Sequence, residues 1–193
     1  METYNIVIVG VGGQGTLLTS RILGNLALTK DYDVKLSEVH GMAQRGGSVI
    51  TFVRFGDSVA EPIIEAGQAD LLIAFERLEA VRYIHLLKPD GLLIMNDERI
   101  DPMPVVIGAA EYPEDKIAAL DDSARVVRIA ARREARELGN LRVFNTIVLG
   151  AASLIMPFAV EEWEQVISET VPAKTVDINL VAFAKGRTFR KDQ

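Results

Sequence analysis

Two glycine-rich segments carry most of the side chains with which this chain could do chemistry. The first, residues 10–15, reads G-V-G-G-Q-G and directly follows the β-branched run of residues 5–9. The second, residues 37–48, reads S-E-V-H-G-M-A-Q-R-G-G-S and contains an acid, a histidine, an amide and an arginine. Both follow predicted strands, which we expect to be neighbours, so the two loops should form one site at the carboxyl edge of a sheet.

The first segment satisfies the G-x-G-x-x-G pattern through Gly10, Gly12 and Gly15, between a predicted strand and a predicted helix. In that context the glycines permit a tight turn and a close approach of the backbone, so that helix N-terminal N–H groups can hold a phosphate. Together with Gly13 and Gln14, these residues are candidate cofactor contacts. The alternative is a close-packed turn between strand and helix that binds nothing.

The second segment places Glu38 near the position where a nicotinamide site needs an acid for the adenosine ribose. The residues after Glu38 do not suit a plain dinucleotide fold, because they add a cation, an amide and a thioether. Arg45 is the predicted anion contact, since a guanidinium suits phosphate or carboxylate. The candidate contacts of this segment are Glu38, His40, Gly41, Met42, Gln44, Arg45, Gly46 and Gly47. The alternatives are a glycine-rich turn without a ligand and, for His40, either a proton carrier or a donor that fixes its own loop.

Composition excludes several kinds of chemistry. The chain has 193 residues, which suits the single domain that we predict over residues 1–193. Its net charge of −6 argues against nucleic acids and membrane surfaces as partners. It has no cysteine, which excludes a thiol nucleophile and a cysteine-ligated iron–sulfur cluster in this chain. Its two histidines lack metal-ligand spacing, so we predict no metal site. We see no leader-like N-terminus and no apolar run of bilayer length, and we expect a cytoplasmic protein.

Apolar periodicity predicts strands that alternate with helices. The predicted strands cover residues 5–9, 33–39, 49–55, 70–75, 92–95, 105–107 and 125–129, with a hairpin-like excursion through Val59 and Ile63. The predicted helices cover residues 16–28, 76–87, 131–138, 143–156, 161–169 and 174–185, and K-P-D-G at 88–91 should end the second of them. This alternation predicts an α/β fold with a doubly wound, mostly parallel sheet flanked by helices, and additional C-terminal helices.

Other polar residues have simpler interpretations. The arginines between Arg125 and Arg142 interleave with glutamates, as on a solvated helix face. Asn145 begins an apolar helical pattern and is interpreted as a cap or a turn residue. His85 lies inside an amphipathic pattern and is interpreted as structural, and the basic C-terminal K-G-R-T-F-R-K as a solvated helix end. We assign no general base, so the catalytic residues are unknown at this level.

Four motifs occur in order and together resemble one family: G-V-G-G-Q-G, S-E-V-H-G-M-A-Q-R-G-G-S-V, A-D-L-L-I-A-F-E and L-G-N-L-R-V-F-N-T-I-V-L-G-A, followed by V-D-I-N-L-V-A-F-A-K-G-R. The chain resembles the gamma-type subunit or domain of 2-oxoacid:ferredoxin oxidoreductases over nearly its whole length. The H-G-M-A-Q-R-G-G version is most similar to the indolepyruvate type.

The resemblance implies oxidative decarboxylation of an aryl or branched 2-oxoacid to its acyl-CoA, with electrons passed to ferredoxin. It implies a hetero-oligomer, in which a larger partner subunit holds the thiamine diphosphate and the iron–sulfur clusters, coenzyme A is the co-substrate, and this chain is inactive alone. The absence of cysteine agrees with that division. Two alternatives stay open: a stand-alone nicotinamide- or flavin-dependent oxidoreductase, and a non-catalytic small-molecule binding module.

Overall fold

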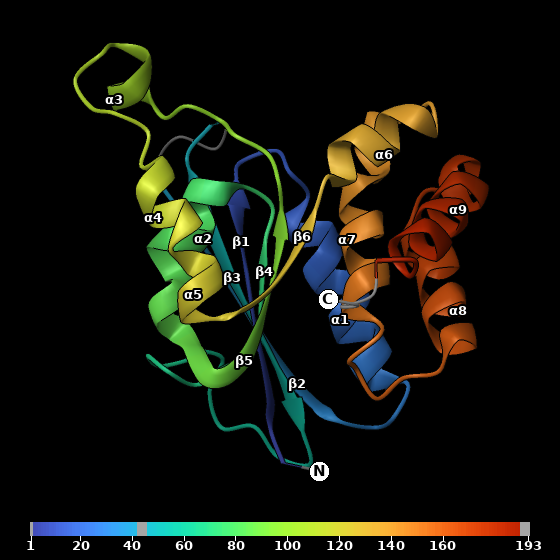
Figure 1. Ribbon diagram of the computed structural model, residues 1–193. Coiled ribbons are helices and arrows are strands. Elements are labelled where there is room, and N and C mark those ends of the chain that lie inside the picture. The colour runs from blue at the N-terminus through green and yellow to red at the C-terminus, as the bar shows by residue number, and fades with distance from the viewer. Residues whose placement is uncertain (1, 42–45, 190–193) are drawn as a thin grey trace.

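A six-stranded sheet forms the centre of the computed structural model, which describes residues 2–41 and 46–189 (Figure 1). Its strands are β1 (Tyr4–Val11), β2 (Asp33–His40), β3 (Ser48–Gly56), β4 (Ala69–Ala74), β5 (Leu87–Asn96) and β6 (Arg125–Ile129). Their order across the sheet is β2-β3-β1-β4-β5-β6, and among these strands β3 alone runs against the others. The sheet is therefore mixed but mostly parallel, as the sequence predicts.

Helices cover both faces of this sheet (Figure 1). One face carries α1 (Thr16–Leu28), α6 (Ala131–Glu137), α7 (Phe144–Ala152), α8 (Val160–Thr170) and α9 (Val176–Gly186). The other face carries α2 (Arg77–Tyr83), α4 (Glu114–Ala118) and α5 (Leu120–Ser123). A further short helix, α3 (Met103–Val106), projects from the body (Figure 1). Short 3-10 turns occupy Ile84–Leu86, Leu141–Val143 and Ala173–Thr175. The predicted fold class, including the C-terminal helices, is confirmed.

Strand β1 lies in the middle of the sheet, and its side chains enter both cores. Ile6 and Ile8 pack among the residues under α1 and α7, whereas Val7 and Val9 pack toward α2. All four side chains are fully buried, as the continuous β-branched run predicts for a strand covered on both faces. This rigid central strand delivers the first glycine-rich segment to the edge of the sheet.

Two of the C-terminal helices, α7 and α9, cross at unusually short range. A Cβ atom on Gly150 would collide with the carbonyl oxygen of Phe183, and one on Gly186 with the carbonyl oxygen of Ile147. Glycine at both positions therefore lets the two backbones touch. At the start of the same contact, Thr146 Oγ1 donates to Asn179 Oδ1 at 2.6 Å.

The sequence prediction is wrong for residues 105–107 and misses two helices. The run Val105–Ile107 was predicted as a strand because it is β-branched, but Val105 and Val106 belong to α3. Pro104 lies in the first turn of α3, where the fixed φ of proline suits a helix. The short helices α4 and α5 were not predicted, since each is too brief to show a helical period.

The segments around β3 and β5 also differ from the prediction. Residues 88–91 were predicted as a turn that ends a helix, but they lie inside β5. The pairing of β4 with β5 shifts register there and forms a bulge, since Ala69 pairs with Leu87 whereas Leu71 pairs with Leu92. The hairpin-like excursion predicted through Val59 and Ile63 is wrong, because residues 57–68 contain no paired strand. The Arg54 side chain fixes this segment through the carbonyl oxygens of Glu61 and Ile63.

Candidate functional site

The first glycine-rich segment forms the predicted turn between β1 and α1. Gly13 and Gly15 have φ angles of 103° and 88°, a left-handed backbone that favours glycine. Gly15 is the N-cap of α1 and offers no side-chain cap, which leaves first-turn N–H groups available at the turn. Position 10 requires glycine for a different reason, which is close packing: a Cβ there would lie 2.9 Å from Gln14 Oε1 and 3.2 Å from Phe75 Cβ. Gly10 is therefore a packing position.

Gln14 directs its amide into the chain. Its Oε1 accepts a hydrogen bond from the Val11 N–H at 2.7 Å, and its Nε2 donates to the Phe75 carbonyl oxygen at 3.1 Å and to Glu98 Oε2 at 3.3 Å. The residue is only 6% exposed. Gln14 therefore shapes the turn and ties it to β4, while its predicted role as a cofactor contact stays a prediction.

The two glycine-rich segments meet, although their strands are not neighbours. The expectation of neighbouring strands is wrong, because β3 lies between β1 and β2. Contact is made instead at the beginning of β3: the Gly12 N–H donates to the Gly47 carbonyl oxygen at 2.8 Å, and the Gly46 N–H to the Gly12 carbonyl oxygen at 3.4 Å. The sequence showed a second strand, but neither its pairing nor its direction.

A buried carboxyl group fixes the same junction from the α2 side. Ser48 Oγ donates to Glu79 Oε2 at 2.5 Å, and Arg82 forms an ion pair with Glu79 at 3.2 Å. Burial raises the pKa of the Glu79 carboxyl, against the opposing effects of the Ser48 hydrogen bond and of Arg82. Gly41 lies exposed at the end of β2, and the predicted contacts Met42, Gln44 and Arg45 lie outside the described residues.

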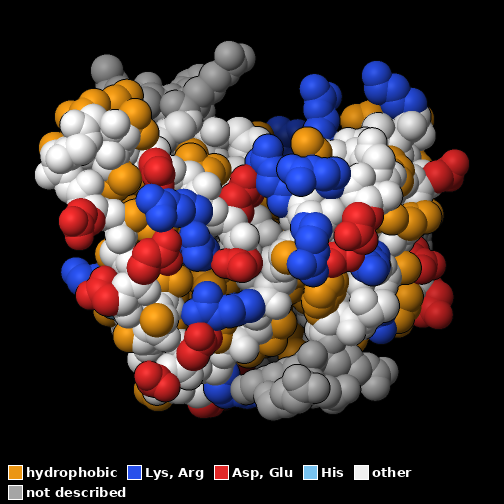
Figure 2. Space-filling model, turned by 45° about the horizontal axis from the view of Figure 1, so that its top comes forward, with side chains coloured by type: hydrophobic (Ala, Val, Ile, Leu, Met, Phe, Trp, Pro, Cys, Tyr) orange, Lys and Arg blue, Asp and Glu red, His pale blue; other side chains and the backbone are white. Residues whose placement is uncertain are grey.

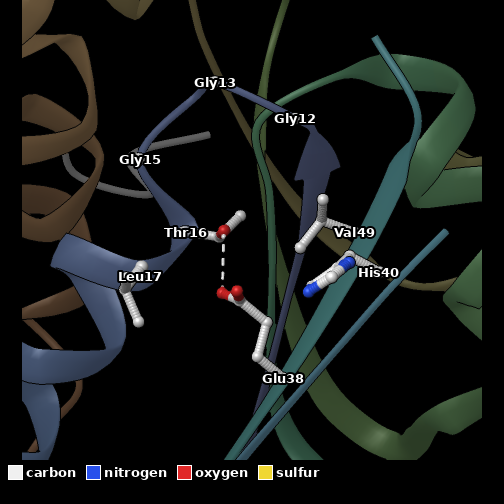
Figure 3. Close-up of a pocket in the computed structure, with 8 residues that line it drawn as sticks. All are labelled: Gly12, Gly13, Gly15, Thr16, Leu17, Glu38, His40 and Val49. Atoms are coloured by element: carbon white, nitrogen blue, oxygen red, sulfur yellow. Dashed lines mark hydrogen bonds between the residues drawn. The ribbon is translucent and has the colours of Figure 1, made fainter. Parts of the chain in front are cut away.

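On the β2 side of the turn lies a pocket of about 370 Å³, which we call the Glu38 pocket (Figure 3). Its lining residues are Gly12, Gly13, Gly15, Thr16, Leu17, Glu38, His40 and Val49. Glu38 Oε2 accepts hydrogen bonds from Thr16 Oγ1 at 3.4 Å and from Thr51 Oγ1 at 3.2 Å. His40 Nδ1 lies 3.2 Å from the Gly41 carbonyl oxygen, a contact that matches the loop-fixing alternative.

On the other side of the turn lies a pocket of about 340 Å³, which we call the arginine pocket. Its lining residues are Gly13, Gln14, Gly15, Arg132, Leu141, Arg142, Phe144 and Asn145. Arg132 is held by Glu98 at 2.6 Å, whereas the Arg142 guanidinium makes no hydrogen bond or ion pair with the described part of the chain. The arginine pocket is thus lined by Arg132, whose guanidinium is ion-paired, and by Arg142, whose guanidinium has no partner in the described part of the chain.

Asn145 supplies a third donor to the arginine pocket. The residue is only 4% exposed, and its Oδ1 accepts the Thr146 N–H at 2.8 Å. Its Nδ2 finds no acceptor among the residues that the structure describes, and it faces Gly15 so closely that a Cβ on Gly15 would collide with it. This unpartnered amide donor of a largely buried residue lies beside two arginines, an arrangement that favours an anionic ligand.

Sequence reasoning missed these three residues. It assigned Arg132 and Arg142 to a solvated helix face and Asn145 to a cap or a turn residue. A usable signal was present: Arg132 comes three residues after β6, and Asn145 lies in the first turn of α7. Residues just after parallel strands and at helix starts gather at the carboxyl edge of a doubly wound sheet. Figure 2 shows Lys and Arg side chains gathered over the region of α6 on this side of the molecule.

The structure gives two further findings about the kind of protein. Among residues 2–41 and 46–189, no three His, Asp or Glu side chains are grouped so that they could hold a metal ion. Within the same residues, no helix has the length and apolar character that crossing a membrane requires.

The fold and the site define an α/β domain in which the Glu38 pocket and the arginine pocket flank the turn of residues 10–15, and we call this region the glycine-turn cleft. Comparisons with known proteins place the domain in a family. Residues 5–189 match the family described as pyruvate ferredoxin/flavodoxin oxidoreductase. The chain is 43% identical to indolepyruvate oxidoreductase subunit IorB of Thermococcus kodakarensis, over 100% of this chain and 98% of that relative. It is 33% identical to 2-oxoglutarate synthase subunit KorC of Methanothermobacter thermautotrophicus, over 94% of this chain and 92% of the relative.

A solved structure shows the same fold inside a longer chain. It is the 2-oxoglutarate:ferredoxin oxidoreductase from Magnetococcus marinus with 2-oxoglutarate, coenzyme A and succinyl-CoA bound. The TM-score is 0.76 at 20% identity, over 100% of this chain and 32% of that chain. Together with the matches of sequence, this confirms the resemblance: the chain belongs to the pyruvate ferredoxin/flavodoxin oxidoreductase family.

Proposed function

We propose that this chain is the small, cluster-free subunit of a cytoplasmic 2-oxoacid:ferredoxin oxidoreductase that acts on indolepyruvate or another aryl 2-oxoacid. The observation that carries the proposal is the 43% identity to an indolepyruvate oxidoreductase subunit over nearly all of both chains. The identity to a 2-oxoglutarate synthase subunit is lower, at 33%. The complex oxidatively decarboxylates the oxoacid to its acyl-CoA and passes the electrons to ferredoxin.

The chemistry of this chain supports a division of labour. With no cysteine, it cannot ligate a cluster through thiolates. We place the iron–sulfur clusters, and with them the thiamine diphosphate that the family resemblance implies, in a larger subunit, which we call the companion subunit. The part of this chain is to bind and orient coenzyme A at the glycine-turn cleft, so that the thiol end of coenzyme A reaches the companion subunit.

The two pockets differ in charge, and that difference supports one of them as the site for the phosphates of coenzyme A. The Glu38 pocket carries a carboxylate, which repels phosphate, next to the exposed ring of His40. The arginine pocket carries two guanidinium groups and the buried Asn145 amide, with Glu98 pairing one of the cations. Coenzyme A has a diphosphate and a 3′-phosphate, and these groups suit Arg142 and Asn145. Gly13, Gln14 and Gly15 of the first glycine-rich segment line this pocket, and we propose that they border the same ligand.

The position of β3 argues against the dehydrogenase alternative. In a dinucleotide-binding fold the acid that holds the ribose follows a strand paired directly with β1. Here β2, which carries Glu38, is separated from β1 by β3, and this adds about 5 Å across the sheet. Glu38 also accepts hydrogen bonds from the hydroxyls of Thr16 and Thr51 already. Both features make Glu38 less suited to bind the ribose of a dinucleotide.

Reconstitution tests the proposal. We would purify this chain and the companion subunit separately and assay each alone and together, with indolepyruvate, coenzyme A, thiamine diphosphate and a redox dye as electron acceptor. We expect turnover only from the mixture, and a higher kcat/KM for indolepyruvate than for 2-oxoglutarate. Turnover by this chain alone, or the same kcat/KM for the two oxoacids, would overturn the proposal.

A further inference from the structure

The short helix α3 presents an apolar tip to solvent. Met103, Val106 and Ile107, which we call the α3 tip, are 68%, 65% and 68% exposed, and no residue of α3 is buried. The segment extends away from the rest of the molecule (Figure 1), and hydrophobic side chains gather at its end (Figure 2). Exposed apolar groups that cluster in this way mark a surface for contact with another protein.

The α3 tip is held in a defined shape by its own backbone. The N–H groups of Val105 and Val106 donate to the Pro102 carbonyl oxygen, and those of Ala109 and Ala110 donate to the Pro104 carbonyl oxygen. The two prolines also fix their own φ angles. A tip that is already ordered loses little conformational entropy when a partner binds it.

A network of polar residues anchors the base of the same segment. The Arg99 guanidinium lies 4.3 Å from the centre of the Tyr112 ring and pairs with Asp101 at 2.6 Å and with Glu114 at 3.1 Å. The Tyr112 hydroxyl donates to Glu76 Oε1 at 2.5 Å, and the residue is 7% exposed. An apolar centre with a charged border has the composition of a protein–protein interface.

The α3 tip projects at the same end of the molecule as the carboxyl edge of β1 (Figure 1). Six of the eleven large hydrophobic side chains that are exposed in the described chain follow the carboxyl edge of the sheet or lie on the α3 tip: Leu17, Val39, Met103, Val106, Ile107 and Leu141. Leu17 lines the Glu38 pocket and Leu141 lines the arginine pocket. A partner that covers this end of the molecule and contacts the α3 tip would also face the two pockets.

We infer that the α3 tip inserts into an apolar recess of the companion subunit and thereby seats that subunit over the glycine-turn cleft. The inference rests on the proposed function, because it takes the companion subunit as the occupant. The companion must approach this edge in any case, since the ligand held in the cleft has to react there. A second copy of this chain has no such reason to meet the cleft.

Direct binding tests the inference with a matched pair of variants. The tip variant is Met103→Ser, Val106→Ser and Ile107→Ser. The control variant is Leu28→Ser, Ile155→Ser and Val181→Ser, which removes three large side chains that are 57%, 43% and 50% exposed away from the cleft. We would titrate the companion subunit with each chain by calorimetry. We expect the tip variant to raise the Kd by about 100-fold or more, and the control variant by less than about threefold.

Two further measurements make every outcome decisive. Equal melting temperatures of the tip variant and the wild-type chain show that a loss of binding is not unfolding. A photo-cross-linking amino acid at position 106 should label the companion subunit, and one at position 181 should not. Unchanged binding by the tip variant, or cross-links only between copies of this chain, would overturn the inference. A wild-type chain that fails to bind the companion subunit would instead refute the proposed function, before any variant is compared.

Discussion

Replacing Arg142 with alanine is the sharpest test of the arginine pocket. The Arg142 side chain has no partner among the described residues, so its removal breaks no ion pair within that part of the chain. If the guanidinium holds a phosphate of coenzyme A, the variant loses one charge-assisted contact, worth about 1.5–3 kcal/mol. The pocket is open to water and Arg142 is exposed, which favours the lower half of that range. We therefore expect the Kd for coenzyme A to rise by about 10–50-fold.

The matched control is Arg136→Ala. Arg136 lies on α6, is exposed, and does not line the arginine pocket, but its loss changes the net charge by the same amount. Arg142→Lys should recover only part of the affinity, because an ammonium keeps the charge without the planar two-point contact. The assay is calorimetric titration of the reconstituted complex with coenzyme A, with melting temperatures measured in parallel. Equal losses of affinity in Arg142→Ala and Arg136→Ala would refute a local phosphate contact and leave only a general charge effect.

Three further predictions follow from the same geometry. Titration of the chain with NADH or NADPH should give no dissociation constant in the low micromolar range, about −8 kcal/mol; such a value would revive the dehydrogenase alternative. Gly15→Ala should lower the free energy of unfolding by about 1–3 kcal/mol, because φ is 88° and the new methyl group meets Asn145, as urea denaturation would show. Hydrogen bonding by Lys185 and then Arg133 holds the pKa of Glu134 below its ordinary value of 4.5, so its stabilising effect is present above about pH 4.5 and is lost as the pH falls further. Glu134→Gln should therefore lower the melting temperature more at pH 7 than at pH 3; an equal drop at both would contradict this.

The sequence predicted the elements that its periodicity describes directly. Helix α1 and strand β6 have the predicted bounds, and β1 is buried on both faces as its β-branched run indicates. The order of the strands could not be predicted, because the alternation of apolar and polar residues identifies β3 as a strand but does not indicate which strands pair with it. Residues 105–107 show the opposite failure: three β-branched residues in a row predict a strand, whereas Val105 and Val106 lie in α3 and both Val106 and Ile107 are exposed.

The candidate site was predicted only on the side where glycines mark it. Gly12, Gly13 and Gly15 do form the turn beside both pockets. The arginine pocket was not predicted, because several arginines follow β6 in close succession and the sequence does not indicate which of them lie together. Arg132 and Arg142 line one pocket because of the way α6 and the turn after it fold. Gln14 has a role that the motif did not indicate, because its amide holds the turn together, and its contact with a cofactor stays a prediction.

The close contact between α7 and α9 has a consequence for the order in which the cleft is completed during synthesis. Asn145 is in the first turn of α7, and its neighbour Thr146 is bound by Asn179 of α9. Gly150 and Gly186 lock the same two helices together further along. Of the described helices α9 emerges last from the ribosome, so the wall of the arginine pocket gains its support only after every strand of the sheet has been made. A nascent chain that stops before α9 would present the glycine turn without the finished pocket beside it.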